Sequence, residues 1–276
     1  MNLQQLRRNY HKSICLKVLG LRNGIPNIAD KSSKRSIELA TSILDQINFS
    51  PCANPPTDQK AGALFEELTL DYLEKAFALL QHLRPGQWHF SVHNKLTDFD
   101  QYEHLAHLTE ILKEHPTLRA TLGNYLIKPD IVIGRRPVSD AEVDQQGKLL
   151  HADIARLTPL RDSNNTQLLL HASISCKLTI RSDRSQNART ESLNLIRNRK
   201  GNTPHIAIVT AEPLPNRIAS LALGTGDLDC VYHMALNELQ QAVIAANEET
   251  LTDMLNLLVE GKRLRDISDL PFDLAI

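Results

Sequence analysis

Three side chains in the middle of the chain, Asp130, Ser175 and Lys177, have types and spacing that suit phosphodiester chemistry. Asp130 follows a proline at the start of an apolar run, where aspartate is uncommon because strands disfavour it. A carboxylate there could hold Mg²⁺ through its oxygens, and the ammonium of Lys177 could steady a phosphate or the attacking water. Asp130 and Lys177 therefore suit the acid and lysine roles of a metal-dependent phosphodiesterase. An aspartate that only protects a strand edge would give the same pattern.

A single carboxylate holds magnesium poorly, so further acids should converge on the site. Glu66 lies among the apolar positions of a helix expected over residues 61–83, whereas Glu67 falls on the opposite, charged side. An inward glutamate is costly unless it meets a cation, which makes Glu66 a candidate. Glu191 lies beside the apolar positions of a helix expected over residues 187–198. A capping or solvated glutamate is the alternative interpretation of Glu191.

Hydrophobic periodicity predicts the elements that position these residues. From His171 onward, residues 168–180 alternate apolar and polar, which predicts a strand with Ser175 and Lys177 on one face and Cys176 in the core. The other expected strands are 127–133 and 205–210, and the expected helices are 36–47, 61–83, 103–112, 187–198, 234–247 and 251–259. This order predicts an α/β fold, with a central mixed β-sheet flanked by helices, in one domain of residues 1–276.

The composition is that of an ordinary globular protein. The 276 residues include 31 Lys and Arg against 32 Asp and Glu, a net charge of -1 that by itself argues against a nucleic-acid partner. No run approaches the roughly 18 apolar residues of a membrane helix, and residues 1–12 lack the apolar core of a signal peptide. We therefore expect a cytoplasmic protein with no membrane partner. Four widely spaced cysteines argue against a disulfide framework or a zinc site.

The net charge conceals a local excess of positive charge. Residues 177–200 contain seven basic and two acidic side chains, a local charge of +5, which would attract phosphates unless it is only a solvated helix face. Within this stretch, Arg181 and Arg184 could each donate twice to a guanine, and Asp183 could accept from cytosine amino groups. An aspartate facing DNA repels phosphates, so its use indicates base reading. The three residues could read two neighbouring C·G pairs.

The order of these residues resembles that of a known enzyme family. Ser175-Cys176-Lys177 is followed by Arg181-Ser182-Asp183-Arg184 and Glu191, and Pro129-Asp130 lies upstream. The arrangement is similar to the type II restriction endonucleases that recognise CCGG-centred sites, a branch of the PD-(D/E)-x-K nucleases. The similarity runs nearly end to end, through the stretches HASISCK, TIRSDR, QNAR, RNRKG, TAEP, ALGTG, DCVYH, GKRL and DISDLP. It implies a restriction-endonuclease-like catalytic core at about residues 61–210, with helical flanks at both ends.

In that branch the second acid of the motif has moved along the chain. By the resemblance, Ser175 stands where the usual acid would be, and Glu191 takes its role. Asp130 and the backbone carbonyl of Cys176 are implied to bind Mg²⁺, two ions per active site, while Lys177 orients the water. The implied catalytic set is Asp130, Lys177, Glu191, Glu66 and Ser175.

The resemblance also implies a substrate and an assembly. Enzymes of this branch cut double-stranded DNA before the first C of CCGG, leaving a 5′ phosphate, a 3′ hydroxyl and a 5′ CCGG overhang. They work as homodimers that pair into homotetramers on two sites, and a cognate DNA methyltransferase acts on the same sequence. Asp30 and Arg217 are implied to read an outer G·C pair and Gln59 to enter the minor groove, which predicts the site GCCGGC.

Two other functions remain open at this stage. A non-specific nuclease of DNA repair would keep Asp130, Lys177 and Glu66 but would have no use for Asp183. A sequence-specific DNA-binding protein that has lost cleavage would need a broken catalytic set, and none is visible in the sequence.

Overall fold

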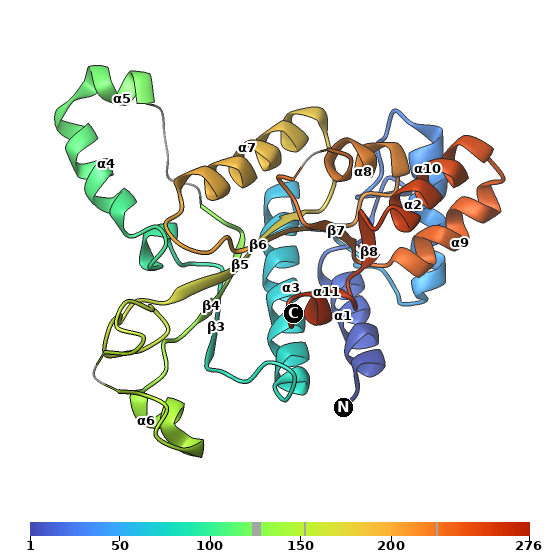
Figure 1. Ribbon diagram of the computed structural model, residues 1–276. Coiled ribbons are helices and arrows are strands. Elements are labelled where there is room, and N and C mark those ends of the chain that lie inside the picture. The colour runs from blue at the N-terminus through green and yellow to red at the C-terminus, as the bar shows by residue number, and fades with distance from the viewer. Residues whose placement is uncertain (123–127, 152, 225) are drawn as a thin grey trace. The chain divides into compact units, whose positions relative to one another are not determined.

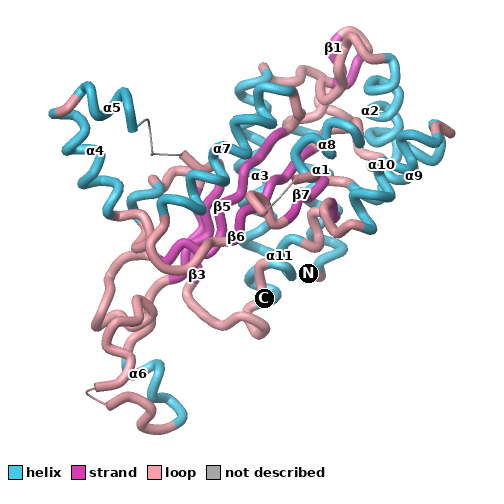
Figure 2. Tube along the Cα trace, turned by 45° about the horizontal axis from the view of Figure 1, so that its top comes forward, coloured by secondary structure: helices cyan, strands magenta, loops and turns pink. Residues whose placement is uncertain are grey.

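The computed structural model describes residues 1–122, 128–151, 153–224 and 226–276, without the side chains of residues 121, 122 and 182–185. Its centre is a six-stranded sheet in the order β3-β4-β5-β6-β7-β8, with helices around the strands (Figures 1 and 2). The strands are β3 (Trp88–Ser91), β4 (Ile131–Arg135), β5 (Leu169–Lys177), β6 (His205–Thr210), β7 (Cys230–His233) and β8 (Leu264–Asp266). β3 pairs antiparallel with β4, whereas β6, β7 and β8 pair in parallel. The predicted α/β fold with a mixed central sheet is confirmed.

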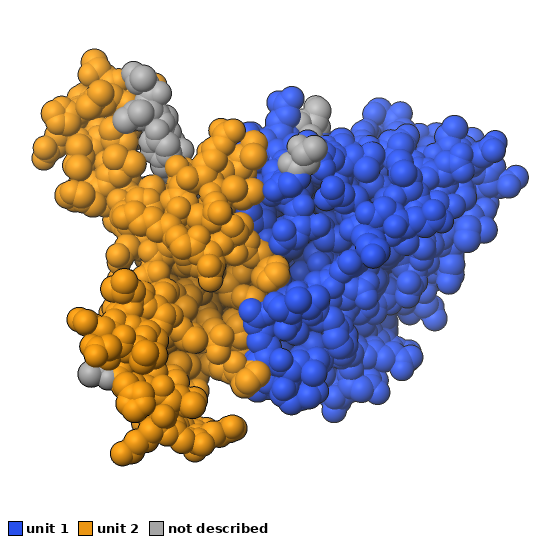
Figure 3. All heavy atoms as spheres, viewed as in Figure 1, with its two compact units in different colours: residues 1–84, 174–192, 206–276 blue, residues 85–173, 193–205 orange. Residues whose placement is uncertain are grey.

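The chain divides into two compact units, which Figure 3 colours separately. Unit 1 comprises residues 1–84, 174–192 and 206–276, and unit 2 comprises residues 85–173 and 193–205. Strand β5 contributes to both units. Asp130 belongs to unit 2, whereas the other predicted site residues belong to unit 1.

Unit 1 contains most of the helices and a small hairpin. The helices are α1 (Leu3–Lys17), α2 (Lys34–Ile47), α3 (Asp58–Leu80), the first part of α7 (Ser182–Asn198), α8 (Pro215–Ala222), α9 (Leu236–Ala246), α10 (Glu249–Glu260) and α11 (Leu270–Asp273). β1 (Leu21–Arg22) and β2 (Ile25–Pro26) form the antiparallel hairpin. Helices α1 and α3 pack through Tyr10 and Tyr72, whose ring centroids lie 5.0 Å apart. The Tyr10 hydroxyl also forms a hydrogen bond of 2.9 Å with Thr69, so this contact is polar as well as apolar.

A buried ion network joins the N-terminal helix to the far edge of the sheet. Arg7 of α1 pairs with Glu238 of α9 and with Asp266 of β8, each at 2.7 Å. Asp266 also accepts the backbone N–H of Leu236 at 3.0 Å, at the start of α9. Because unpaired buried charges are costly, Arg7 fixes α1, α9 and β8 to one another.

Unit 2 is smaller and is built on the antiparallel pair β3–β4. Its other elements are η1 (Leu96–Asp98), α4 (His104–Glu114), α5 (Pro116–Leu122), α6 (Asp140–Val143) and η2 (Asp144–Gln146). The buried Gln101 side chain donates to the carbonyl of Leu170 at 2.8 Å and accepts its N–H at 2.9 Å. This amide therefore fastens the loop before α4 to the first half of β5.

The central strand follows its predicted pattern with one exception. Leu170, Ala172, Ile174 and Cys176 are buried, as the alternation predicts, but Ser173 on the other face is also only 5% exposed. Regular pairing in β5 ends at residue 177 instead of 180, and β4 begins at residue 131, four residues later than predicted. Residue 127 lies outside the described residues. The six predicted helices are present. The α-helices and strands that were not predicted are α1, α5, α6, α8, α11, β1, β2, β3, β7 and β8.

Among the described residues, no helix combines the length and the apolar character that crossing a membrane requires.

Candidate active site

The end of β5 and the face of α7 bring two of the predicted residues together. Helix α7 buries Ala188, Ser192 and Leu195, which leaves Glu191 half-buried beside this apolar face. The hydroxyl of Ser175 lies 3.5 Å from the carboxylate oxygen Oε2 of Glu191, at the long limit of a hydrogen bond. The carboxylate of Glu191 on helix α7 thus lies next to Ser175 on strand β5.

Glu66 occupies the border of the buried face of α3. The residues that α3 buries nearby are Phe65, Thr69 and Leu73, and Glu66 is half-buried while Glu67 is exposed. The predicted difference between the two glutamates is confirmed.

Asp130 lies at the start of β4, half-buried and directly after the buried Pro129. It belongs to the other unit, so its convergence with Lys177 stays a prediction. Cys176 is 6% exposed, with its side chain on the core face of β5, as the alternation predicts. The predicted Mg²⁺ ligand is the backbone carbonyl of Cys176, and burial of the thiol does not affect that prediction.

Sequence reasoning missed two residues that hold the backbone at the end of β5 and directly after it. The hydroxyl of Thr210 donates to the carbonyl of Lys177 at 2.7 Å, and the backbone N–H of Glu212 donates to that hydroxyl at 3.1 Å. The Glu212 carboxylate then accepts the N–H of Ile180 at 2.8 Å. The available signal was an acid in the otherwise apolar stretch after β6, where burial raises the pKa of Glu212 to about 7.

The residues predicted to read CCGG follow this held backbone. Arg181 comes directly after Ile180 and is exposed. Asp183 and Arg184 lie in the first turn of α7, but their side chains are outside the described residues. Of the three side chains the structure describes only that of Arg181, and the base-reading role of all three stays a prediction.

Two arginines of the basic stretch are used within the fold. The guanidinium of Arg189 donates to the carbonyls of Ser220 and Leu221 at 3.0 and 3.2 Å, at the C-terminal end of α8. Arg199 donates to the carbonyl of Ile196 in the last turn of α7. Cationic groups suit helix C-termini, where carbonyls lack intrahelical partners. Only part of the positive charge of residues 177–200 is therefore left to attract phosphates.

The two residues predicted to read the outer base pair lie together. Arg217 of α8 forms an ion pair with Asp30, in the loop before α2. Asp30 also accepts the hydroxyl of Ser32 at 2.7 Å and its backbone N–H at 3.0 Å. These hydrogen bonds and Arg217 lower the pKa of Asp30 to about 2, so it is ionised at neutral pH. Gln59, the predicted minor-groove residue, is exposed in the first turn of α3.

The donors proposed for a metal ion are all oxygens, which suits Mg²⁺. In the described parts of the chain, no three His, Cys, Asp or Glu residues gather to hold a metal ion. Magnesium does not need such a cage, because it usually keeps several waters and takes one or two carboxylates together with substrate phosphates. Asp130, Glu191 and the carbonyl of Cys176 fit that pattern of donors.

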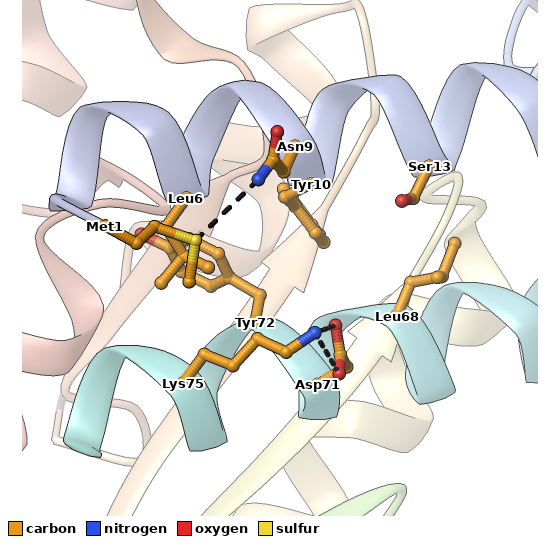
Figure 4. Close-up of a pocket in the computed structure, with 9 residues that line it drawn as sticks. All are labelled: Met1, Leu6, Asn9, Tyr10, Ser13, Leu68, Asp71, Tyr72 and Lys75. Carbon is orange, nitrogen blue, oxygen red and sulfur yellow. Dashed lines mark hydrogen bonds and ion pairs between the residues drawn. The ribbon is translucent and has the colours of Figure 1, made fainter. Parts of the chain in front are cut away.

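A small pocket between α1 and α3 lies apart from these residues (Figure 4). Leu6, Tyr10 and Tyr72 line it, and its charged residues Asp71 and Lys75 pair with each other at 2.6 Å. Because its charges are matched and the predicted site residues do not line it, the pocket is not a candidate for the chemistry.

The chain is similar in sequence to restriction enzymes. The family model described as "NgoMIV restriction enzyme" matches residues 10–276. The type II restriction enzyme NgoMIV of Neisseria gonorrhoeae is 46% identical over 280 residues, which cover 99% of this chain and 98% of that protein. Among solved structures, the type IIF restriction endonuclease Bse634I with cognate DNA is 12% identical with a TM-score of 0.35, covering 96% of this chain and 99% of that chain. The complex of restriction endonuclease PspGI with substrate DNA is 11% identical with a TM-score of 0.31, covering 99% and 92%.

Proposed function

The chain belongs to the NgoMIV restriction enzyme family, and from this premise we propose that it cleaves double-stranded DNA at GCCGGC, before the first C. As a member of that family it is a type II restriction endonuclease, a site-specific deoxyribonuclease. The specific proposal is a 5′ CCGG overhang produced by Mg²⁺-dependent phosphodiester hydrolysis. The observation that supports it best is the approach of Glu191 to Ser175, because it delivers an acid to the place where the strand motif lacks one.

The catalytic residues divide the work of hydrolysis among them. Asp130 and the carbonyl of Cys176 would hold the metal, with Glu66 and Glu191 completing the acidic set. Bound Mg²⁺, in our proposal two ions per active site, would supply positive charge to the scissile phosphate and activate water. Lys177 would orient the attacking water and offset the charge that builds up on the phosphate. Water attacks phosphorus in line and the bond to O3′ breaks, which leaves a 5′ phosphate and a 3′ hydroxyl.

Base reading would use groups whose charge state suits their partners. Arg181 and Arg184 would each donate twice to a guanine of CCGG, and Asp183 would accept from the cytosines. Arg217 and Asp30 would read the outer G·C pair in the same way, with Gln59 in the minor groove. The low pKa of Asp30 supports this role, because an ionised carboxylate is purely an acceptor and cytosine offers an amino donor.

The remaining proposals concern assembly and setting. We propose that residues 1–276 act as one endonuclease domain, with the catalytic core at about residues 61–210. Two such chains would form a homodimer on each palindrome and two dimers a homotetramer on two sites. A cognate methyltransferase would protect the same sequence in the host DNA, and the enzyme would meet foreign DNA in the cytoplasm.

Digestion of a plasmid of known sequence, followed by sequencing of the ends, tests the proposed function. With Mg²⁺ we expect cleavage at every GCCGGC and ends that begin with 5′ CCGG, and with a chelator we expect intact plasmid. Ends at unrelated sequences would identify a non-specific nuclease. Retardation of a GCCGGC duplex without cleavage, in any divalent metal, would identify a DNA-binding protein without catalysis.

A further inference from the structure

We propose that Glu212 is a positioning residue that couples the reading of the outer base pair to the reading of CCGG, a role that rests on the proposed recognition of GCCGGC. The residue is 0% exposed and touches neither DNA nor the reacting atoms in this proposal. It acts through the two backbone segments that carry the base-reading side chains.

One carboxylate binds both recognition segments. Oxygen Oε2 of Glu212 accepts the N–H of Ile180 at 2.8 Å, and oxygen Oε1 accepts the N–H of Leu214 at 3.2 Å. Ile180 directly precedes Arg181, which is predicted to read the CCGG core. Leu214 is the residue before α8, the helix that carries Arg217. The two oxygens therefore join the segment for the inner pairs to the segment for the outer pair.

Side chains that do not belong to α8 bind the backbone at both of its ends. Its N-cap, Leu214, provides no side-chain hydrogen bond, and Pro215 follows it as the first helical residue. At the other end, Arg189 of α7 binds the carbonyls of Ser220 and Leu221. The carboxylate of Glu212 thus joins the start of α8 to Ile180, beside the proposed inner-pair residue Arg181. The guanidinium of Arg189 joins the end of α8 to helix α7.

The consequence for DNA reading follows from the geometry of bidentate contacts. Such contacts tolerate errors of only about 0.5 Å in the position of the arginine. Arg181 lies directly beyond a backbone that Thr210 also holds, through the carbonyl of Lys177. Arg217 lies on a short helix whose N-cap residue, Leu214, donates its backbone N–H to Glu212. Loss of the Glu212 contacts should therefore release Arg217 first and relax the outer pair while CCGG is still read.

The variant Glu212→Gln tests the coupling, because it keeps the size of the side chain and one acceptor but replaces the other oxygen by a donor. The measurement is kcat/KM on GCCGGC relative to ACCGGT, in which the outer pair is changed, and relative to GCATGC, in which the inner pairs are changed. We expect the first ratio to fall on the order of tenfold and the second to change less than about twofold. The exposed Glu249 of α10 provides the matched control Glu249→Gln, which should leave both ratios unchanged.

Two outcomes would overturn the inference. If both ratios are unchanged in Glu212→Gln, the contacts do not position the base-reading residues. If both ratios fall equally, Glu212 is a general structural residue. Failure of the unaltered enzyme to cut GCCGGC would instead count against the proposed function, and the outer-pair ratio would then be measured on the sequence that is cut.

The unaltered enzyme offers a second measurement that needs no variant to fold. With a pKa of about 7, Glu212 should gain a proton between about pH 8 and about pH 6, which weakens its acceptance from N–H groups. Among the side chains that the structure describes, the charged and titratable groups that act on Glu212 are Arg217, Asp30 and His233. Asp30 has a pKa of about 2, and burial lowers the pKa of His233 to about 4, so neither changes its charge in this pH range.

We expect the ratio of GCCGGC to ACCGGT to decrease as the pH is lowered from about 8 to about 6. The pH dependence of hydrolysis itself is common to both duplexes and cancels in the ratio. In Glu212→Gln the ratio should be low and independent of pH. A ratio that stays constant in the unaltered enzyme over this range would contradict the proposed coupling.

Discussion

At the end of β5, a serine occupies the position two residues before the lysine, and an acid reaches it from a helix. Ser175 and Glu191 are 16 residues apart in sequence, yet their oxygens lie 3.5 Å apart. A metal site requires a carboxylate at the right position in the folded protein, and its position in the sequence does not matter. A helix face can therefore supply the carboxylate as well as a strand can. A pattern search that requires an acid two residues before the lysine would miss this candidate site.

Replacement of Lys177 by alanine should abolish cleavage and leave DNA binding. The ammonium is proposed to stabilise charge that develops during hydrolysis, and removal of one such group typically costs on the order of a hundredfold or more in kcat. Binding is measured by retardation of a GCCGGC duplex and cleavage by single-turnover kinetics. The control is Lys148→Ala, an exposed lysine of unit 2. Retained cleavage in Lys177→Ala would remove the residue from the active site.

Replacement of Arg217 by alanine should relax the outer base pair. The loss of one bidentate base contact should cost about 1–3 kcal/mol on GCCGGC and much less on ACCGGT. The relevant measurement is the binding free energy of both duplexes at one salt concentration, with the variant and the unaltered protein. An equal loss on both duplexes would instead identify Arg217 as a phosphate contact.

Glu212 should also make stability depend on pH. Its pKa in the folded protein is about 7, above its usual 4.5, so it contributes stability that is fully present below about pH 4.5 and is lost as the pH rises through 7. The difference between the two values corresponds to about 3 kcal/mol.

Urea unfolding at about pH 5 and about pH 8 tests this dependence. The unaltered protein should lose free energy of unfolding between pH 5 and pH 8, because Glu212 becomes charged while buried. Glu212→Gln has no charge to bury and should lack this part of the pH dependence. Parallel behaviour of the two proteins would show that Glu212 has the same pKa folded and unfolded.

At the scale of elements, local periodicity predicted most of those that are long and one-sided, although the 15-residue helix α1 was missed. The alternation in β5 and the apolar face of α7 lie within single windows of sequence, and the structure follows both. Strands β7 and β8 have only 4 and 3 residues, too few to show a period, and β7 is buried throughout. Helix α8 spans only 8 residues between a Pro-rich loop and Gly224, so its pattern was equally short.

Contacts between distant segments could not be predicted from the sequence in this way. Arg7 and Asp266 are 259 residues apart, and Glu212 meets Ile180 across 32 residues. Periodicity shows which side chains turn inward, but it does not show which partner each one meets. The roles of Asp30 and Arg217 came from resemblance alone, and their ion pair is visible only in the folded chain.

The Arg7 network offers a test at this scale. The side chains of Arg7, Glu238 and Asp266 are only 17, 16 and 7% exposed. Arg7→Met should therefore lower the free energy of unfolding by about 3–5 kcal/mol, because it leaves two carboxylates without their cation. The control is Lys12→Met, an exposed lysine on the same helix, and both variants are measured by urea unfolding. A loss below about 1 kcal/mol would mean that α1, α9 and β8 are held mainly by apolar packing.

For the whole molecule, the net charge of -1 is compatible with DNA binding because the charge is unevenly distributed. The stretch 177–200 carries +5, but Arg189 and Arg199 of that stretch bind backbone carbonyls. The remaining cations provide limited general attraction to phosphates. Under the proposed base reading, specificity would depend on a few directed contacts, beside which the buried carboxylate of Glu212 holds the backbone.

The last prediction concerns the assembly of the whole molecule on DNA. If two dimers form a tetramer that must engage two sites, a second GCCGGC on the same plasmid is present at high effective concentration. A plasmid with two sites should then be cut faster per site than a plasmid with one, at equal enzyme and site concentrations. Addition of a short GCCGGC duplex should accelerate cleavage of the one-site plasmid, and a duplex of unrelated sequence should not. Equal rates on both plasmids, with no effect of the added duplex, would show that each dimer acts independently.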